Sequence, residues 1–166
     1  MDRLRFLILG GLVAIPCAAT IVADPPKLLV WNASASMPRG LYRIRPNAVL
    51  RRGDTVVAWL PRKVRGLAAE RGYLPAGVPL VKRVAAMPGD QICARRSTVS
   101  VNGKASGIRV GSDPRRRLLP AWSGCFRLRP DEFLLLGQSS GSFDGRYFGP
   151  SKKRDIIGQV VLLWRA

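Results

Sequence analysis

Two serines lie two residues apart in the segment NASASMPRGLY, residues 32–42, directly before a Met-Pro turn. A serine hydroxyl becomes a nucleophile only when a neighbouring group takes its proton. The chain contains no histidine, which excludes a Ser-His-Asp triad, a His-ligated zinc site and any imidazole acid-base step. The base for Ser34 or Ser36 must therefore be a lysine, a carboxylate or an N-terminal amine.

Lys82 is the lysine whose surroundings suit that role. The other five lie beside turns, in a predicted helix or in basic clusters, where the amine is solvated: Lys27, Lys63, Lys104, Lys152 and Lys153. Lys82 instead interrupts an apolar strand pattern, and alternation along the strand gives it apolar neighbours on one face: Leu80, Val84 and Ala86. Arg83 points to the other face. Burial can lower a lysine pKa by about 3–5 units, which would make the free amine available. The alternative is a lysine that extends its amine to the edge of the sheet.

The serine pair fits the same chemistry. In an extended segment, residues i and i+2 face the same side, so we expect the hydroxyls of Ser34 and Ser36 to converge. One can attack a carbonyl while the other donates a hydrogen bond to the oxyanion, beside a backbone N–H. Pro38 excludes Met37 from helical angles and Gly40 permits a tight reversal, which predicts a turn at Ser36. A Ser-rich polar loop is the alternative interpretation of this segment taken alone.

The N-terminus predicts a membrane segment. Arg3 and Arg5 precede an uncharged apolar run from Phe6 to Ala23. A helix of about eighteen residues is roughly 27 Å long, close to the thickness of a hydrocarbon core. Basic residues ahead of the run favour a cytoplasmic N-terminus and export of the chain beyond the run. We therefore predict an anchor or signal segment at residues 1–23 and a single domain at 24–166. The length of the run favours an uncleaved anchor over a cleavable signal.

The cysteines add one open question. Cys17, Cys93 and Cys125 are too widely spaced to form a four-thiolate metal site, and we expect no metal. Export would place Cys93 and Cys125 in an oxidising compartment, where a disulfide between them would close a loop of about thirty residues. A pair of free thiols is the alternative.

The strongly positive charge of the chain limits its possible partners. Lys and Arg number 28 against 10 Asp and Glu, a net charge of +18. Such a charge indicates nucleic acid, an anionic membrane surface or a plain basic coat. The basic residues are scattered, without interleaved aromatic residues or a helix-turn-helix pattern. We therefore expect no nucleic-acid partner and favour the membrane surface or the plain coat.

Dense turn signals divide the exported part into short elements. The patterns predict a helix at 62–73, a hairpin on Asn102-Gly103, and strands, which lie at 28–31, 41–45, 55–60, 78–86, 91–94, 132–137 and 156–164. Residues 104–124 are basic and rich in Gly, Ser and Pro, and we expect a mobile surface loop there. The expected fold class is mainly β with one short helix.

Three segments taken in order carry a family resemblance: SASMPRGLY at 34–42, LVKRVAAMPGD at 80–90 and GQSSGSFDGRYFGP at 137–150. With the N-terminal apolar run, they resemble the type I signal peptidases, which are Ser/Lys membrane proteases, and most of all the TraF-type pilin-processing peptidases of conjugal transfer. The resemblance implies a coiled β-sheet domain resting on the outer face of the membrane after an N-terminal transmembrane helix. It implies Ser36 as nucleophile and Lys82 as general base. Ser34 then donates its hydroxyl to the oxyanion hole, together with the N–H of Ser36.

The third segment implies supporting residues. Ser142 matches the hydroxyl that orients the lysine amine, and Asp144 with Arg146 matches a supporting pair. The chain departs from the family pattern at two positions. Gln138 stands where an Asp usually follows Gly, and Gly145 replaces the Ser usually found between Asp and Arg.

The activity implied is that of a membrane-anchored serine endopeptidase that cleaves leader segments of exported precursors, with a conjugative pre-pilin as the expected substrate. The acyl-enzyme would be released by water, or by the pilin's own amino terminus to give a cyclic product. We expect no cofactor, and a monomer crossing the bacterial inner membrane once with its catalytic domain in the periplasm. A non-catalytic assembly factor of an envelope secretion complex is the main alternative, and a membrane-tethered DNA-binding module is the third.

Overall fold

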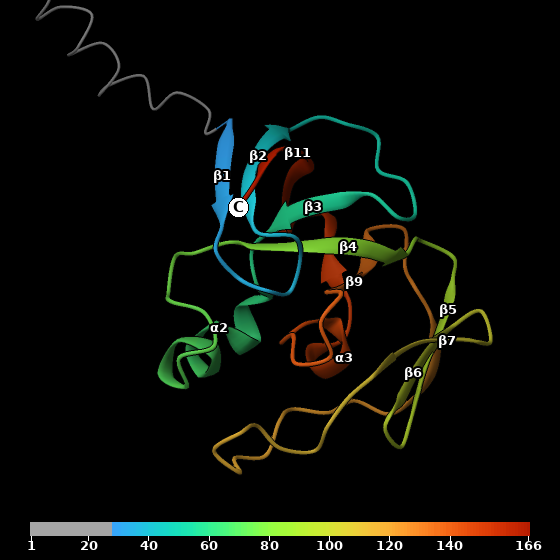
Figure 1. Ribbon diagram of the computed structural model, residues 1–166. Coiled ribbons are helices and arrows are strands. Elements are labelled where there is room, and N and C mark those ends of the chain that lie inside the picture. The colour runs from blue at the N-terminus through green and yellow to red at the C-terminus, as the bar shows by residue number, and fades with distance from the viewer. Residues whose placement is uncertain (1–27) are drawn as a thin grey trace, which may run out of the picture.

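The computed structural model describes residues 28–166 (Figure 1). The predicted anchor at 1–23 lies outside these residues, and within 28–166 no helix combines the length and apolar character needed to cross a bilayer. The fold is mainly β, as predicted. In chain order the elements are β1 (Leu29–Asn32), β2 (Gly40–Arg45), β3 (Thr55–Ala58), α2 (Arg62–Glu70), β4 (Leu80–Ala86), β5 (Gln91–Arg95), β6 (Thr98–Val101), β7 (Lys104–Ile108), β8 (Gly124–Arg127), β9 (Glu132–Leu136), α3 (Gly145–Phe148), β10 (Ser151–Lys152), the 3-10 turn η1 (Lys153–Asp155) and β11 (Ile156–Arg165).

The strands form two antiparallel sheets. The larger has seven strands in the order β1-β2-β11-β3-β4-β9-β10, and the smaller has four in the order β7-β6-β5-β8. β11 changes register against both of its neighbours, at Leu162/Trp164 and at Ile156/Gly158. Such irregularities increase local twist and let a sheet curl. In the view of Figure 1, β4 runs from the side where α2 lies to the side where β5, β6 and β7 lie.

β9 joins the two halves of the core. All five of its residues are buried, which is the expected pattern for a strand covered on both faces. Phe133 and Leu135 pack into a cluster with α2, β3 and β4, whereas Leu134 and Leu136 pack with the inner face of the small sheet. A third cluster lies on the other side of β2, β3 and β11, and Met37 packs into it. Successive side chains of β9 thus pack into both clusters and connect them. The neighbouring strand β4, which carries Lys82, lies beside this connected core.

The predicted helix at 62–73 is present but ends at Glu70. Val64 and Ala68 are its buried residues, one turn apart on the same side. Gly72 has a φ of +71°, a left-handed conformation that ends helices and that glycine adopts without strain. The helix therefore ends before the predicted residue 73, and Tyr73 lies outside it.

The region predicted as a mobile loop, 104–124, needs a correction. Its first five residues are strand β7, which completes the hairpin predicted on Asn102-Gly103, whose φ values of +48° and +80° suit a two-residue hairpin turn. Its last residue begins β8, which the sequence patterns missed. The chain between is fastened at Asp113, which is buried and accepts hydrogen bonds from the backbone N–H groups of Arg115 and Arg117.

The open question of the cysteines has an answer in the small sheet. Cys93 in β5 and Cys125 in β8 face each other across the two strands and form a disulfide. The two residues are 32 positions apart in the chain. The loop closed by the bond contains the hairpin and the whole connection to β8, so the disulfide ties this connection back to the sheet.

Candidate active site

Ser36 and Lys82 are 46 residues apart in the chain and meet in the folded protein. The Lys82 Nζ donates a hydrogen bond of 2.6 Å to the Ser36 Oγ. Ser36 lies on the turn between β1 and β2, and Lys82 lies in the middle of β4, directly opposite Val56 of β3. Both residues are buried, with 8% and 4% of their surface exposed. The site therefore places a hydroxyl against an amine in a largely dry position.

The serine pair converges, but not as an extended segment. Residues 34–37 form a bend and turn, and the Ser34 Oγ lies 2.7 Å from the Ser36 Oγ. Met37 is buried in the core beneath the turn, and the Tyr42 hydroxyl donates to the Pro38 carbonyl at 2.7 Å. The two hydroxyls converge as expected. The cause is a turn held in place by the buried Met37 and by the Tyr42 hydrogen bond, rather than alternation along a strand.

The surroundings of Lys82 change its pKa. Burial is the main cause and lowers the pKa from 10.5 to about 8; the negative charge of Asp144 opposes this shift, and the positive charge of Arg146 adds to it. Within residues 28–166, Lys82 forms no ion pair. At a pKa of about 8, roughly one tenth of the amine is neutral at pH 7. Lys82 can therefore accept a proton near physiological pH.

The predicted apolar face around Lys82 is present in part. Leu80 and Val84 pack in the same cluster as α2 and Phe148, so they flank the amine's side chain along β4. Arg83 is exposed, as expected for the other face. Ala86 departs from the prediction, because β4 changes register against β9 between Val84 and Ala86. Ala86 consequently packs toward the small sheet.

Asp144 and Arg146 form a buried ion pair behind the site. The Arg146 Nη2 donates to the Asp144 Oδ2 at 2.6 Å and the Nε donates to the Oδ1 at 2.9 Å. Asp144 also accepts the backbone N–H of Gly137 at 2.7 Å, and Arg146 donates to the carbonyls of Ser139 and Gly137. The pair therefore fixes the backbone that begins at Gly137.

That fixed backbone directly contacts the turn at residues 34–37, which carries Ser36. The Gln138 N–H donates to the Ser36 carbonyl at 2.7 Å. A Cβ on Gly137 would collide with the Ser142 hydroxyl and would lie 3.0 Å from the Ser36 carbonyl oxygen. Gly145, the second departure from the family pattern, has a structural reason: a Cβ there would lie 2.8 Å from Leu134 and 2.9 Å from the Leu135 carbonyl.

Ser142 lies close to Ser36 and Lys82 without a hydrogen bond to either. The side chain is buried against Gly137, and its Oγ has no partner among the described residues. Ser142 lines the same groove as Ser36 and Lys82. Its role in orienting the lysine amine stays a prediction.

A groove of about 620 Å³ opens onto Ser36 and Lys82. Its lining comes from residues 31–36, 73–75, 78–82, 139 and 141–143. The turn before β2 forms one side, and the connection from α2 to β4 forms the other. The sequence patterns did not identify this second wall. Tyr73 in it donates its hydroxyl to Asp113 at 2.6 Å, so the connection between β7 and β8 braces the groove.

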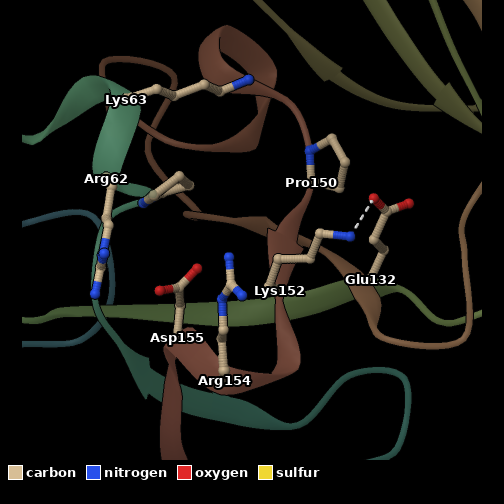
Figure 2. A pocket seen from close by; sticks show the side chains of 8 residues that line it. Arg62, Lys63, Glu132, Pro150, Lys152, Arg154 and Asp155 are labelled. Atoms are coloured by element: carbon tan, nitrogen blue, oxygen red, sulfur yellow. Dashed lines mark hydrogen bonds and ion pairs between the residues drawn. The ribbon is translucent and has the colours of Figure 1, made fainter.

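A second cavity, of about 340 Å³, lies at the start of α2 (Figure 2). It is lined mainly by charged side chains: Arg62, Lys63, Glu132, Lys152, Arg154 and Asp155. Figure 2 shows Lys152 hydrogen-bonded to Glu132, at 3.0 Å, and Asp155 is paired with Arg65. Among residues 28–166, its lining includes no serine or other nucleophilic hydroxyl and shares no residue with the groove.

Known proteins match most of this chain. The family model described as signal peptidase, peptidase S26, matches residues 2–165. A plasmid transfer protein TraF of Escherichia coli is 34% identical, covering 96% of this chain and 96% of that protein. A probable conjugal transfer protein TraF of Sinorhizobium fredii is 35% identical, covering 80% and 76%. A crystal structure of a signal peptidase I from Enterococcus faecalis is similar with a TM-score of 0.39 and 17% identity, covering 69% of this chain and 98% of that one. The match to the family model and the identities to the TraF proteins together show that this chain belongs to the signal peptidase family, peptidase S26, among its TraF members.

Proposed function

We propose that this protein is a membrane-anchored serine endopeptidase that cleaves leader segments from exported precursors. The observation that carries the proposal is the 2.6 Å contact between the Ser36 hydroxyl and a Lys82 amine whose pKa burial lowers to about 8. An ordinary lysine, at its reference pKa, would be neutral in only a few parts in ten thousand at pH 7. A buried lysine with a lowered pKa is instead suited to serve as a general base.

The mechanism is acyl transfer. Neutral Lys82 takes the Ser36 proton as the Oγ attacks the scissile carbonyl, and the oxyanion accepts hydrogen bonds from the Ser34 hydroxyl and the Ser36 N–H. The protonated amine then gives its proton to the leaving amine as the peptide bond breaks. Water, or an amine in its place, attacks the acyl-enzyme and releases the product. Ser142 and the Asp144–Arg146 pair support the backbone and amine around these two groups.

The groove suits an extended peptide. Its walls are mostly apolar, and small side chains next to the scissile bond would fit between them while the peptide backbone pairs with the site. The curated relatives carry the names plasmid transfer and conjugal transfer. Those names support a role in conjugative transfer, and we propose a pre-pilin of such a system as the substrate, cleaved with or without closure of a ring.

The surface next to residue 28 supports a membrane location. Large apolar side chains are exposed there on β1, on β11 and just before β1: Leu28, Leu29, Trp31, Leu163 and Trp164. The rings of Trp31 and Trp164 contact each other at 5.7 Å between centroids. Tryptophan favours the interface between water and lipid. We therefore place a monomer on the periplasmic face of the bacterial inner membrane, anchored by residues 1–23.

The test is cleavage of a co-expressed pre-pilin, read by mass spectrometry, which reports leader removal and ring closure together. Ser36→Ala and Lys82→Ala are expected to abolish processing. Ser97→Ala and Lys104→Ala, which alter exposed residues of the small sheet region, are the matched controls and should process normally. If both active-site variants process the precursor near the wild-type rate, the peptidase proposal is wrong. Pilus assembly that survives both active-site variants would favour the assembly factor.

The proposed location has its own test. Alkaline phosphatase fused after Ala166 is active only when exported, so an active reporter is expected. An inactive reporter would place the domain in the cytoplasm and contradict the proposed topology.

A further inference from the structure

Asn32, the last residue of β1, organises the turn that carries Ser36. Its side chain is buried, with 6% of the residue exposed. The Nδ2 donates to the carbonyl oxygens of Ser34 at 3.1 Å, Met37 at 3.1 Å and Pro38 at 3.0 Å. The Oδ1 accepts from the Ser34 backbone N–H at 3.2 Å and from the Ser34 hydroxyl at 3.1 Å. A single side chain therefore contacts both ends of the turn at residues 34–37, the nucleophile turn, and also the hydroxyl of Ser34.

These contacts fix the orientation of the amide. Three carbonyl oxygens face the Nδ2, so exchanging nitrogen and oxygen would set oxygen against oxygen. The Oδ1 can only accept, so the Ser34 hydroxyl gives it its one proton. In the 2.7 Å contact between the serines, Ser36 must then be the donor. The Lys82 Nζ donates in turn to Ser36. The hydrogen bonds run in one direction, from Lys82 through Ser36 and Ser34 to Asn32.

This direction is opposite to the one that the reaction needs. The Ser36 proton points away from Lys82, and the Ser34 proton points away from the place of a reacting carbonyl. Both hydroxyls must turn about their C–O bonds before the Ser36 proton can reach the Lys82 lone pair and the Ser34 proton can reach an oxyanion. When Ser34 turns, the Asn32 Oδ1 keeps the Ser34 backbone N–H as a donor. The buried acceptor is therefore never left without a partner, whose loss would be costly.

We propose that Asn32 is a positioning residue for the peptidase reaction. It orders the nucleophile turn and holds the Ser34 hydroxyl until the carbonyl of a docked substrate takes that hydroxyl as its donor. This inference rests on the proposed function, because it assigns Asn32 a part in the same reaction. Asn32 acts on the rate by keeping the turn in the shape that brings the Ser34 hydroxyl to the oxyanion, so its effect on the rate depends on that hydroxyl. A residue that only stabilised the fold would lower stability without any such dependence.

The test is a double-mutant cycle on Asn32 and Ser34, using the full-length protein in detergent and a conjugative pre-pilin as the substrate. Ser34→Ala removes one oxyanion donor and is expected to lower kcat by about 10²–10³-fold. Asn32→Ala is expected to lower kcat by about 10–100-fold with KM changed by less than about threefold. The double variant should lie within about threefold of Ser34→Ala, because residues that act through each other are not additive. Effects that multiply in full, or a kcat for Asn32→Ala within about twofold of wild type, would overturn the proposal.

Asn102→Ala is the matched control. Asn102 also orders a turn, accepting from the Gln91 N–H at 2.9 Å and donating to Asp90 at 2.8 Å, but in the small sheet. It should lower the unfolding midpoint and leave kcat unchanged. If Asn32→Ala does not unfold cooperatively, Asn32→Gln takes its place. This variant keeps the amide donors and acceptor but shifts them by one methylene, so the turn and the Ser34 hydroxyl are held less well and kcat should again fall at constant KM. A wild-type kcat in Asn32→Gln would overturn the proposal.

The two proposals fail in different ways. Cleavage that requires Ser36 and Lys82 but is indifferent to Asn32 overturns the inference about Asn32 alone. Cleavage that survives Ser36→Ala and Lys82→Ala, or no cleavage by the wild-type protein, overturns the peptidase proposal and with it the role of Asn32.

Discussion

Lys82 and Lys152 lie in the same sheet, but their surroundings shift their pKa values in opposite directions. Lys152, in β10, is part of the charged cavity and donates to Glu132 and Asp131 at 3.0 and 3.2 Å. These carboxylates, Glu132 first, raise its pKa, and its side chain is 33% exposed. Lys82, in β4, is buried without an ion pair among the described residues, and burial lowers its pKa to about 8.

The difference lies in the surroundings of each amine rather than in the strand that carries it. Carboxylates within hydrogen-bonding distance stabilise the ammonium form and make Lys152 a structural cation. Near Lys82, the carboxylate of Asp144 is already engaged by Arg146 and by the Gly137 N–H. Its charge therefore reaches Lys82 only in part, and burial decides the outcome. Lys82 can therefore lose its proton more readily than Lys152, because the carboxylate that would stabilise its ammonium form is engaged by other groups.

Exchanging each lysine for methionine separates the two regions most strongly. Lys82→Met removes the proposed general base and is expected to lower kcat by at least about 10³-fold, within the range for loss of acid-base catalysis. Lys152→Met should leave kcat and KM within about twofold, because it touches neither the groove nor the dyad. Steady-state cleavage of a pre-pilin measures both. Equal losses of kcat in the two variants would show that Lys82 has no special part in the reaction.

The same pair of variants should affect stability in opposite directions. The folded-state pKa of Lys82 lies below the unfolded value, so charging the amine costs stability at every pH below about 8, and this cost disappears as the pH rises past 10.5. A fall from 10.5 to about 8 corresponds to about 3 kcal/mol. Losing the hydrogen bond to Ser36 takes back about 1 kcal/mol. Lys82→Met should therefore raise the free energy of unfolding at pH 7 by about 2 kcal/mol, and Lys152→Met should lower it.

Urea unfolding at pH 7 and at pH 10.5, with each variant compared with wild type, checks this prediction. The advantage of Lys82→Met should be present at the lower pH and absent at the higher one. A Lys82→Met protein that is less stable than wild type at pH 7 would mean that the amine is solvated.

The pH dependence of cleavage is set by the same pKa. Activity needs the neutral amine, so kcat/KM should rise about tenfold per pH unit below about 8 and level off above it. A docked substrate excludes more water from Lys82, so the midpoint for kcat should lie below that for kcat/KM. Lys152→Met should leave both midpoints unchanged. A profile that is flat between about pH 6 and 9 would contradict the account.

The smallest expected effect concerns the groove wall. Burial alone would raise the pKa of the Asp113 carboxyl, but hydrogen bonds from Tyr73 and Arg117 outweigh it and lower that pKa. Asp113→Ala frees Tyr73 and is expected to raise KM about fivefold, the equivalent of one hydrogen bond, with kcat unchanged. Asp131→Ala, which removes an exposed partner of Lys152, is the control and should change neither constant. A fall in kcat with KM constant in Asp113→Ala would show that the wall acts on chemistry instead.

The sequence predicts those parts of the molecule that depend on local pattern. The apolar runs around Lys82 and at 132–137 indicate β4 and β9, because the apolar residues of each strand are enough to predict that it is buried. The pairing of Val56 with Lys82 is not local, so periodicity alone gives the face of Lys82 but not its neighbours. The β-bulge before Ala86 shows the limit of the same rule.

Asn32 and α3 were beyond local pattern for a related reason. The Asn32 side chain acts through carbonyls up to six residues away, which come within reach only once the turn has closed. The one-turn helix α3 is buried and begins at the Asp144 cap, and its Arg146 reaches the carbonyl of Ile108 in β7. A signal for Asn32 does exist in the chain: a polar residue ending an apolar strand, two positions before a serine pair.

The most direct test of the account is the titration of the Lys82 amine itself. The ¹³C shift of the lysine ε-carbon reports ionisation, and Lys82→Arg assigns the signal. We predict a midpoint near 8 for Lys82 and, in the same sample, a midpoint above the ordinary lysine value for Lys152. A Lys82 signal that titrates at or above 10.5 would contradict it.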